Sequence, residues 1–312
     1  MVDRRAVLTI GDPSCIRNFH MQRQRDARTL PFLLIAMILV PAFLWGCGKR
    51  DHGPVLTLAG STSVQPFAEK LADEYMAKHP EVLINVQGGG STAGIQSVKE
   101  GVANIGMCSR NLKESEKNGL VLIEIARDGL AVIVHPDNPV SNLTLAQIRG
   151  LFSGQIKSWR EVAPTQAPSE GDLKVRVITR EDGSGTRGAF QELVMGETEI
   201  SDDALVQDSN GAVREVVAGD RNIVGYISLG LVDPERRIFR DSVRAVMIDG
   251  VKPTEENILK GGYKFSRPFL FLTQGPASGV ATDFIQFVLS PEGQDLLGKE
   301  GLVKAGASHE SH

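Results

Sequence analysis

Short apolar runs alternate with amphipathic stretches along the chain from residue 55 onward. Residues 55–59 form one such run, and residues 64–79 repeat apolar side chains at helical spacing until Pro80 ends the pattern. The apolar positions of that stretch are Val64, Phe67, Leu71 and Tyr75. Because strand-like and helix-like segments take turns along the chain, the sequence predicts an α/β fold.

The same patterns predict the remaining elements. Strands are expected at residues 82–87, 104–108, 121–125, 130–134, 175–179, 223–229, 243–248 and 269–273. Helices are expected at residues 95–102, 143–152, 187–195, 208–217, 281–289 and 291–297, the second of them capped by Thr144. Residues 126–129, 163–172 and 250–262 are expected to connect these elements without regular structure.

Three of the predicted strands end in loops rich in Gly, Ser and Thr, at residues 60–63, 88–92 and 182–186, and a helical stretch follows each loop. Such a loop directs free backbone N–H groups, a helix N-terminus and hydroxyl donors toward one point, which suits an anion. One loop alone indicates no more than a helix cap worth ~1 kcal/mol. Three of one type predict a buried oxyanion held from several sides.

Several other kinds of site lack their motifs. The loops contain no GKS or GKT, no GxSxG and no GxGxxG followed by an acidic residue, so neither a nucleotide site nor a nucleophile elbow is predicted. The histidines are scattered, so we expect no metal site, no cofactor and no catalytic residue. A secreted phosphate-ester hydrolase with Ser91 or Ser184 as nucleophile is an alternative, although it lacks an evident base and metal ligands.

The first residues predict export. An almost wholly apolar run at residues 30–46 follows Arg23, Arg25 and Arg28, as in a secretory signal peptide. The run is short for a membrane-spanning helix and contains two prolines, which favours the signal peptide over a spanning helix. The sequence LWGC that ends at Cys47 resembles a bacterial lipobox, although Trp45 replaces the usual small residue. We therefore expect a lipoprotein signal peptide at residues 1–46, with Met1 or Met21 as its start, and lipid on Cys47. An uncleaved anchor is the alternative; either way the chain works outside the cytoplasm, anchored to the membrane or in the periplasm.

Charge and cysteine content narrow the class of protein. The formal net charge is −4 and no basic stripe is visible, so nucleic acid is not an expected partner. An acidic chain that binds an anion needs a local, pre-organised site. The three cysteines are Cys15, Cys47 and Cys108, which leaves no disulfide within the mature chain and predicts a buried, inert Cys108.

Changes in amino-acid composition near residues 135 and 262 predict two lobes. A tether at residues 47–54 would lead into a discontinuous first lobe, at 55–134 and 262–308, with the second lobe at 135–261 and a tail at 309–312. Two strands crossing between the lobes would form a hinge, and the cleft between the lobes would hold the ligand. We expect the protein to be a monomer.

Charged and polar residues beside the loops are further candidates. Arg180 precedes the third loop and suits bidentate binding of an oxyanion, and Asp182 is expected to orient it by a salt bridge. Ser109 and Arg110 follow the strand at 104–108. Ser109 can donate and accept hydrogen bonds, whereas Arg110 is expected either to approach the anion or to face solvent.

Six motifs in order carry a family resemblance: GSTSVQP, VQGGGSTAGI, NIGMCSRNLK, NPVSNLTLAQIRGLFSGQIKSW, REDGSGTRGAF and VGYISL. The chain resembles the phosphate-binding substrate lipoproteins of phosphate ABC transporters. The resemblance implies a two-lobed periplasmic-binding-protein fold with two crossover hinge strands, inorganic phosphate as ligand and ABC permease subunits as partners. It places phosphate contacts on Thr62, Ser63, Ser91, Ser109, Arg180, Ser184, Gly185 and Thr186, with Ser61, Arg110 and Asp182 nearby.

One position departs from some members of this family, which carry an Asp where Ser109 stands. That carboxylate accepts the proton of a phosphate O–H and repels fully ionised sulfate. With Ser109 in its place, Asp182 or a backbone carbonyl would have to accept the phosphate proton. One alternative is therefore the same fold binding sulfate, arsenate or molybdate. A separate alternative is a sensor or adhesion lipoprotein that has kept the fold and lost transport.

Overall fold

The computed structural model describes residues 53–164, 173–232 and 242–306, all within one compact unit that spans residues 52–312. The predicted signal peptide at 1–46, Cys47, most of the tether and the tail at 309–312 lie outside the described residues, as does most of the connector at 163–172. Within the described ranges, no helix combines the length and hydrophobicity that a membrane crossing needs.

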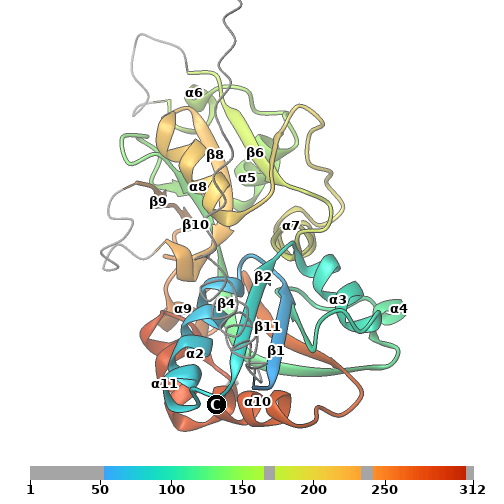
Figure 1. Cartoon of the computed structure of the whole chain (residues 1–312). Coiled ribbons are helices and arrows are strands. Elements are labelled where there is room, and N and C mark those ends of the chain that lie inside the picture. Colours follow the sequence, from blue (N-terminus) through green and yellow to red (C-terminus); the bar gives the residue numbers. More distant parts are fainter. Residues whose placement is uncertain (1–52, 165–172, 233–241, 307–312) are drawn as a thin grey trace, which may run out of the picture. The chain divides into compact units, whose positions relative to one another are not determined.

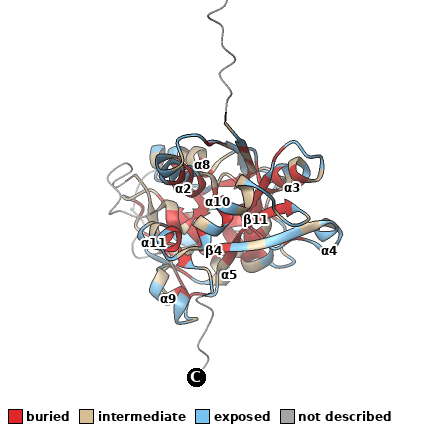
Figure 2. Ribbon diagram, turned by 60° about the horizontal axis from the view of Figure 1, so that its bottom comes forward, coloured by how far each residue is buried: buried red, intermediate tan, exposed pale blue. Residues whose placement is uncertain are grey.

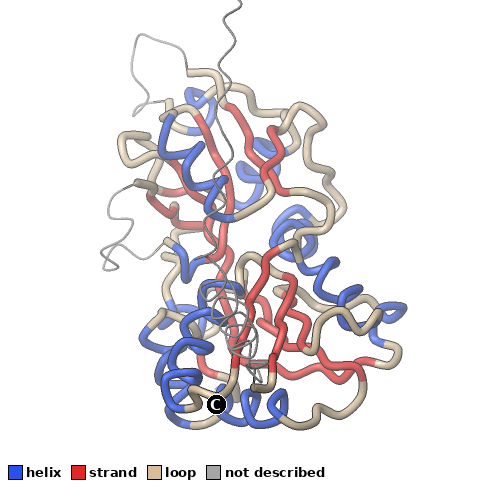
Figure 3. Tube along the Cα trace, in the orientation of Figure 1, coloured by secondary structure: helices blue, strands red, loops and turns tan. Residues whose placement is uncertain are grey.

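A ten-stranded sheet organises the described residues, and the α/β fold is confirmed (Figures 1 and 3). Its main path is β2 (Leu83–Gly88), β1 (Val55–Gly60), β3 (Ile105–Cys108), β11 (Ser266–Gln274), β4 (Leu120–Val134), β8 (Ile223–Ser228), β6 (Arg176–Arg180) and β7 (Leu205–Gln207). Two further strands, β9 (Arg244–Ala245) and β12 (Val303–Lys304), pair with β4, and β5 (Asn142–Leu143) pairs with β10 (Met247–Ile248).

The long strand β4 joins the two ends of this sheet. Its first part pairs antiparallel with β11 as far as Gly129, and its last part, Leu130–Val134, pairs antiparallel with β8. The prediction of two strands separated by a turn at residues 126–129 was wrong. Arg127 and Asp128 continue the ladder to β11, and the Asp128 side chain is buried against Arg267. A pattern based on hydrophobicity treats two charged residues in a row as the end of a strand, and so it missed this continuation.

Helices cover both parts of the sheet (Figure 1). They are α2 (Gln65–Lys78), α3 (Ser91–Lys99), α4 (Glu114–Lys117), α5 (Leu145–Phe152), α6 (Trp159–Val162), α7 (Gly185–Phe190), α8 (Asn210–Gly219), α9 (Glu255–Leu259), α10 (Val280–Leu289) and α11 (Pro291–Lys299). Helix α7 continues as a π-helix over Gln191–Met195. Thr144 caps α5 as predicted, because its hydroxyl accepts from the Gln147 N–H while the Gln147 side chain accepts from the Thr144 N–H.

Two large apolar cores pack against the sheet, one against β8 and the last part of β4, the other against β1, β3 and β11. Strand β11 is buried over most of its length (Figure 2). The second of these cores contains Phe67, Tyr75 and Phe284, from α2 and α10. The first contains Phe190 and Tyr226, whose rings stack with centroids 3.9 Å apart. Each core thus packs helices against its own part of the sheet.

Short elements account for most of the differences from the sequence prediction. The pattern missed α4, α6, α9, β5, β7 and β12, and the strand expected at 243–248 is divided into β9 and β10. The connector predicted at 250–262 contains α9, whose first turn is capped by Thr254. Elements of so few residues carry too little periodicity to be detected, so tertiary contacts and caps decide them.

Candidate oxyanion site

The first two loops follow neighbouring parallel strands. Strand β1 ends at Gly60 and β2 ends at Gly88, and the Gly90 N–H donates to the Gly60 carbonyl at 2.9 Å. Gly60 has φ 135° and Gly90 has φ 90°, conformations that residues with a Cβ rarely adopt. The glycines therefore let two strand ends approach closely enough for their loops to share one site.

Helix α3 begins at this point with no side-chain cap on its N-terminus. Ser91, its first residue, is buried and instead accepts a hydrogen bond from the Ser109 N–H at 3.0 Å. The positive end of the helix dipole is thus directed toward the loops, an arrangement that favours an anion.

The third loop follows β6. Ser184 caps α7 by accepting from the Arg187 N–H at 3.3 Å, and it is followed by Gly185 and Thr186, all three buried. Its backbone reaches the second loop, because the Thr92 N–H donates to the Gly183 carbonyl at 3.1 Å. The three loops singled out in the sequence therefore lie side by side.

Hydroxyl groups meet where the loops converge. Ser63 Oγ lies 2.8 Å from Thr186 Oγ1, and Ser61 Oγ donates to Ser109 Oγ at 2.8 Å. A Cβ added to Gly185 would come within 2.1 Å of Ser91 Oγ and 2.6 Å of Ser109 Oγ. Of the predicted contact residues, Ser61, Ser63, Ser91, Ser109, Arg180, Ser184, Gly185 and Thr186 are buried, and Thr62 is half-buried.

Arg180 brings a buried positive charge to this cluster. Its side chain is only 1% exposed, and its Nη2 donates to Thr62 Oγ1 at 3.2 Å and to the Asp208 carbonyl at 3.0 Å. Its Nη1 is buried and has no hydrogen-bond partner among the described residues. A buried guanidinium with unpaired N–H donors beside a hydroxyl is well suited to bind an oxyanion.

Glu181, rather than Asp182, orients this guanidinium. Its two carboxylate oxygens accept from Arg180 Nε and Nη2, each at 2.9 Å. The sequence prediction that Asp182 pairs with Arg180 was wrong. Asp182 is 92% exposed and pairs with Arg187 at 2.9 Å, because the turn after β6 points its side chain outward.

Arg110 neither faces solvent nor shows an approach to the hydroxyl cluster. It forms a two-pronged pair with Glu116 at 2.7 and 2.8 Å, and its Nη2 also lies 3.3 Å from Thr92 Oγ1. These hydrogen bonds raise the pKa of Arg110 and lower that of Glu116. Arg110 therefore supports the second loop through its contact with Thr92.

A second buried arginine, which sequence reasoning missed, lies under the cluster. Arg267 of β11 donates from Nη2 to Ser63 Oγ at 3.0 Å and from Nη1 to the Ser109 carbonyl at 3.1 Å. Its partner is Asp128 of β4, at 3.1 Å, and both side chains are at most 1% exposed. Burial raises the pKa of Asp128 and lowers that of Arg267, while the charge of each opposes the shift of the other.

Asn210 is the other missed residue. It begins α8, is buried, and donates from Nδ2 to Ser63 Oγ at 2.9 Å and toward Thr62 Oγ1 at 3.4 Å. Part of a signal for Asn210 was present, since the polar residues 208–211 open a predicted helix, but the short strand before them, β7, was missed, so a fourth strand, polar loop and helix could not be recognised. No comparable signal marked Arg267, which lies between Ser266 and Pro268 within a buried strand.

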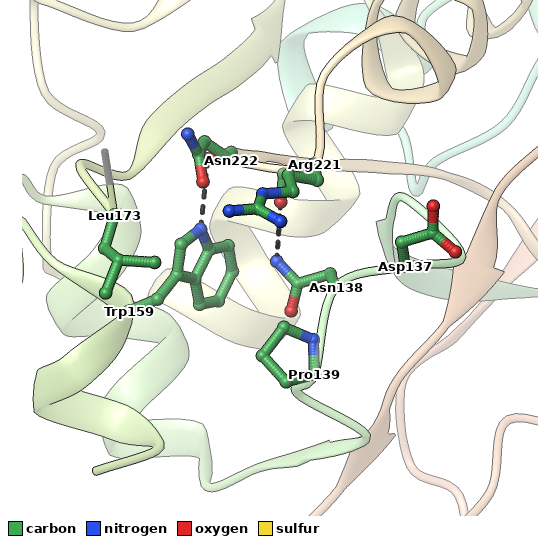
Figure 4. A pocket seen from close by; sticks show the side chains of 7 residues that line it. All are labelled: Asp137, Asn138, Pro139, Trp159, Leu173, Arg221 and Asn222. Atoms are coloured by element: carbon green, nitrogen blue, oxygen red, sulfur yellow. Dashed lines mark hydrogen bonds between the residues drawn. The ribbon is translucent and has the colours of Figure 1, made fainter. Parts of the chain in front are cut away.

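Cys108 borders the cluster, since its thiol donates to the Arg110 carbonyl at 3.4 Å and interacts with the Ser91 hydroxyl. Burial raises the pKa of the Cys108 thiol, so the inert role predicted for Cys108 agrees with its surroundings. A small pocket elsewhere is lined by Asp137, Asn138, Pro139, Trp159, Leu173, Arg221 and Asn222 (Figure 4). In that pocket Trp159 Nε1 donates to the Asn222 carbonyl and Asn138 Nδ2 to the Arg221 carbonyl, so these two donors are already paired.

Known proteins match the chain over most of its length. Residues 48–292 match the model of the PBP superfamily domain. A phosphate-binding protein PstS of Bacillus subtilis is 31% identical over 78% of this chain and 78% of its own length. The chain belongs to the PstS family of phosphate-binding proteins. The resemblance inferred from the six sequence motifs is thereby confirmed.

Two solved structures extend this likeness to three dimensions. A protein from Clostridium perfringens, described as a phosphate ABC transporter substrate-binding protein with bound phosphate, is 43% identical with a TM-score of 0.73. An ABC-type phosphate transport receptor from Vibrio cholerae is 40% identical with a TM-score of 0.63. Each match covers 80% of this chain and 99% of the other. The fold is that of the periplasmic binding proteins.

Proposed function

We propose that this protein captures inorganic phosphate outside the cytoplasmic membrane and delivers it to the permease of a phosphate ABC transporter. Membership of the PstS family supports this function, as does the phosphate bound by the Clostridium perfringens relative. It is a binding protein and catalyses no reaction. The observation that carries the proposal is Arg180, a buried guanidinium with unpaired N–H groups beside the converging hydroxyls.

The phosphate contacts are assigned to the residues of the three loops. Thr62 and Ser63 come from the first loop, Ser91 from the second, and Ser184, Gly185 and Thr186 from the third. Ser109 and Arg180 complete the set. Arg110 and Asp182 are left out because each is engaged by another partner, Glu116 and Arg187 respectively.

Capture requires the loops to separate and close again, because the contributing side chains are buried. We assign the motion to two lobes with the boundaries predicted from sequence, 55–134 with 262–308 and 135–261. Strand β4, which pairs with both parts of the sheet, and the segment leading into β11 would be the crossover strands. Closure would then join the third loop to the first two.

The partners follow from the family. ABC permease subunits would receive the phosphate from a monomeric protein, and lipid on Cys47 would hold the protein at the membrane surface. Labelling with a radioactive fatty acid, with Cys47→Ser as the control, tests the anchor, and an unlabelled wild-type protein would contradict it.

Calorimetric titration of the protein, freed of carried-over anions, tests phosphate binding. We expect one phosphate per chain and a loss of affinity of at least about a hundredfold in Arg180→Ala, because charge-assisted hydrogen bonds are lost. Arg176→Ala is the matched control, since Arg176 lies on the same strand but its side chain is 48% exposed. Unchanged affinity in Arg180→Ala would overturn the assigned site, and hydrolysis of a chromogenic phosphate ester would overturn the binding role.

A further inference from the structure

Three hydroxyls of the cluster, those of Thr62, Ser63 and Ser109, each face two hydrogen-bond donors. A hydroxyl offers two lone pairs and one proton. Where two donors occupy the lone pairs, only the proton remains for a ligand. The protonation state of the anion that fits this site can therefore be read from the neighbours of each hydroxyl, provided that the proposed function holds.

Ser63 has both lone pairs filled. Arg267 Nη2 donates to its Oγ at 3.0 Å and Asn210 Nδ2 at 2.9 Å. The orientation of the Asn210 amide is fixed, because its Oδ1 accepts from the Ser228 N–H at 3.1 Å and so places Nδ2 toward Ser63. Ser63 is left to donate its proton toward the third loop or a ligand.

The Thr62 hydroxyl also faces two hydrogen-bond donors. Its Oγ1 faces Arg180 Nη2 at 3.2 Å and Asn210 Nδ2 at 3.4 Å. Neither nitrogen can accept a proton from it, since guanidinium and amide NH₂ groups are donors. Thr62 is therefore a donor to any ligand that it touches.

Ser109 stands at the position where some family members carry an acidic proton acceptor. Here Ser61 Oγ donates to Ser109 Oγ at 2.8 Å, and Arg267 Nη1 approaches it at 3.4 Å. Both lone pairs thus face donors, and Ser109 too retains only its proton, which can point to Ser91 Oγ at 3.4 Å or to a ligand. The acceptor that an Asp would supply at this position is not replaced by the serine.

The carboxylates near the cluster are engaged elsewhere. Glu181 accepts from Arg180 with both oxygens. Asp128 accepts from Arg267 and from the Gly230 N–H. Asp182, which the sequence suggested as the acceptor for a phosphate proton, is exposed and paired with Arg187. None of these three carboxylates therefore offers a free oxygen to a protonated ligand.

We infer that Arg267 and Asn210, together with Arg180 and Ser61, make Thr62, Ser63 and Ser109 donor-only groups. None of these three hydroxyls then accepts a phosphate proton, so the site favours the phosphate dianion and does not exclude sulfate by a carboxylate acceptor. Arg267 and Asn210 act through the hydroxyls and are positioning residues. Specificity then depends on tetrahedral shape and charge rather than on recognition of a phosphate O–H.

The first test is titration of the protein with inorganic phosphate over a pH series that spans the second ionisation of phosphate, which lies near neutral pH. If only the dianion binds, the apparent affinity falls about tenfold for each pH unit below that ionisation. Calorimetry in two buffers with different heats of ionisation should show release of up to one proton per phosphate in that range. Sulfate, which is a dianion throughout, is the control for titration of the protein itself and should bind with nearly constant affinity.

The second test introduces the missing acceptor. In the unmodified protein we expect sulfate to compete with an affinity within about a hundredfold of that of phosphate. Ser109→Asp should retain phosphate, lose sulfate and flatten the pH dependence, because a carboxylate accepts the phosphate proton and repels an anion without one. Ser109→Asn, similar in size but without charge, should still bind sulfate.

The outcomes separate this inference from the proposed function. Phosphate affinity that rises with pH, together with competition by sulfate, supports both. Phosphate binding at constant affinity over the pH series, or phosphate binding that excess sulfate cannot displace, overturns the inference and leaves the function standing. Failure of the unmodified protein to bind phosphate at any pH overturns the function itself. If Ser109→Asp does not fold, the pH series and sulfate competition on the unmodified protein decide alone.

Discussion

Ser63 Oγ and Thr186 Oγ1 lie 2.8 Å apart in the buried centre of the site, although 123 positions separate them in the sequence. Ser63 belongs to the loop after β1 and Thr186 to the first turn of α7. Because Arg267 and Asn210 fill the lone pairs of Ser63, the proton shared by this pair belongs to Ser63. Thr186 then keeps its own proton for a ligand, so the contact both joins the loops and orients a donor.

Replacing Thr186 by Val tests this contact, because Val keeps the shape of the side chain and removes only the hydroxyl. We expect phosphate affinity to fall about fivefold, as the loss of one hydrogen bond worth ~1 kcal/mol predicts. Thr273→Val is the control, since it removes another buried hydroxyl, one that donates to the Gly275 carbonyl at 2.8 Å. Calorimetric titration of both variants checks the prediction, and equal phosphate affinity in the two would contradict it.

Gly185 allows the third loop to approach the other two. A Cβ at this position would lie 2.1 Å from Ser91 Oγ and 2.6 Å from Ser109 Oγ, so Gly185→Ala should push the loops apart. We expect a loss of phosphate affinity of about a hundredfold or more, since misplaced donors no longer converge on one anion. Gly219→Ala is the matched control, because a Cβ at the end of α8 meets nothing within 4 Å. If Gly185→Ala bound phosphate as tightly as Gly219→Ala, the loops would not close as described.

The long elements of the fold could be predicted because their hydrophobic periodicity is strong. The helix predicted at 64–79 corresponds to α2, and Thr144 caps α5 as expected. The prediction failed at residues 126–129, where Asp128 looks like a turn residue but lies in the middle of β4. A buried charge is hidden from such a pattern until its partner is known, and Arg267 is 139 positions away.

At the site, too, local sequence features were predictable and long-range contacts were not. Ser, Thr and Gly at strand ends carry a local signature, so the loops of Ser63, Ser91 and Thr186 could be singled out from sequence. The pairing of Arg180 with Glu181 rather than Asp182 depends on which way a turn directs each side chain, and spacing does not specify that. Local motifs therefore identify which loops to examine, while long-range contacts decide what each group can donate or accept.

The pair of Arg267 and Asp128 should dominate the stability cost of mutations near the site. Removing either charge leaves the other buried without compensation, which typically costs ~3–5 kcal/mol. We expect Arg267→Met and Asp128→Asn each to lower the free energy of unfolding by about this much, and the double variant to lose less than the sum. Urea denaturation measures the cycle. Lys260→Met is the control, because the pair of Lys260 with Glu256 is exposed and should leave stability nearly unchanged. Strict additivity in the double variant would show that the two buried charges do not interact.

The pair of Arg110 and Glu116 predicts a stability change in mild acid. Hydrogen bonds from Arg110 hold the pKa of Glu116 below its usual 4.5 in the folded protein. The unfolded chain therefore takes up the proton first as the pH falls. The stabilisation from this pair is complete above the unfolded pKa and disappears as the pH falls through the lower folded pKa.

Glu116→Gln removes this dependence. At neutral pH the variant should be less stable than the unmodified protein, and the difference in free energy of unfolding should shrink as the pH falls below about 4.5. Glu114→Gln removes the same charge from the same short helix, at a side chain that is 89% exposed, and serves as the control. Urea denaturation at a series of pH values measures both differences. A stability difference for Glu116→Gln that stays constant into acid would mean that Arg110 does not stabilise the charged carboxylate, and the support that Arg110 gives to the second loop would then rest on its contact with Thr92 alone.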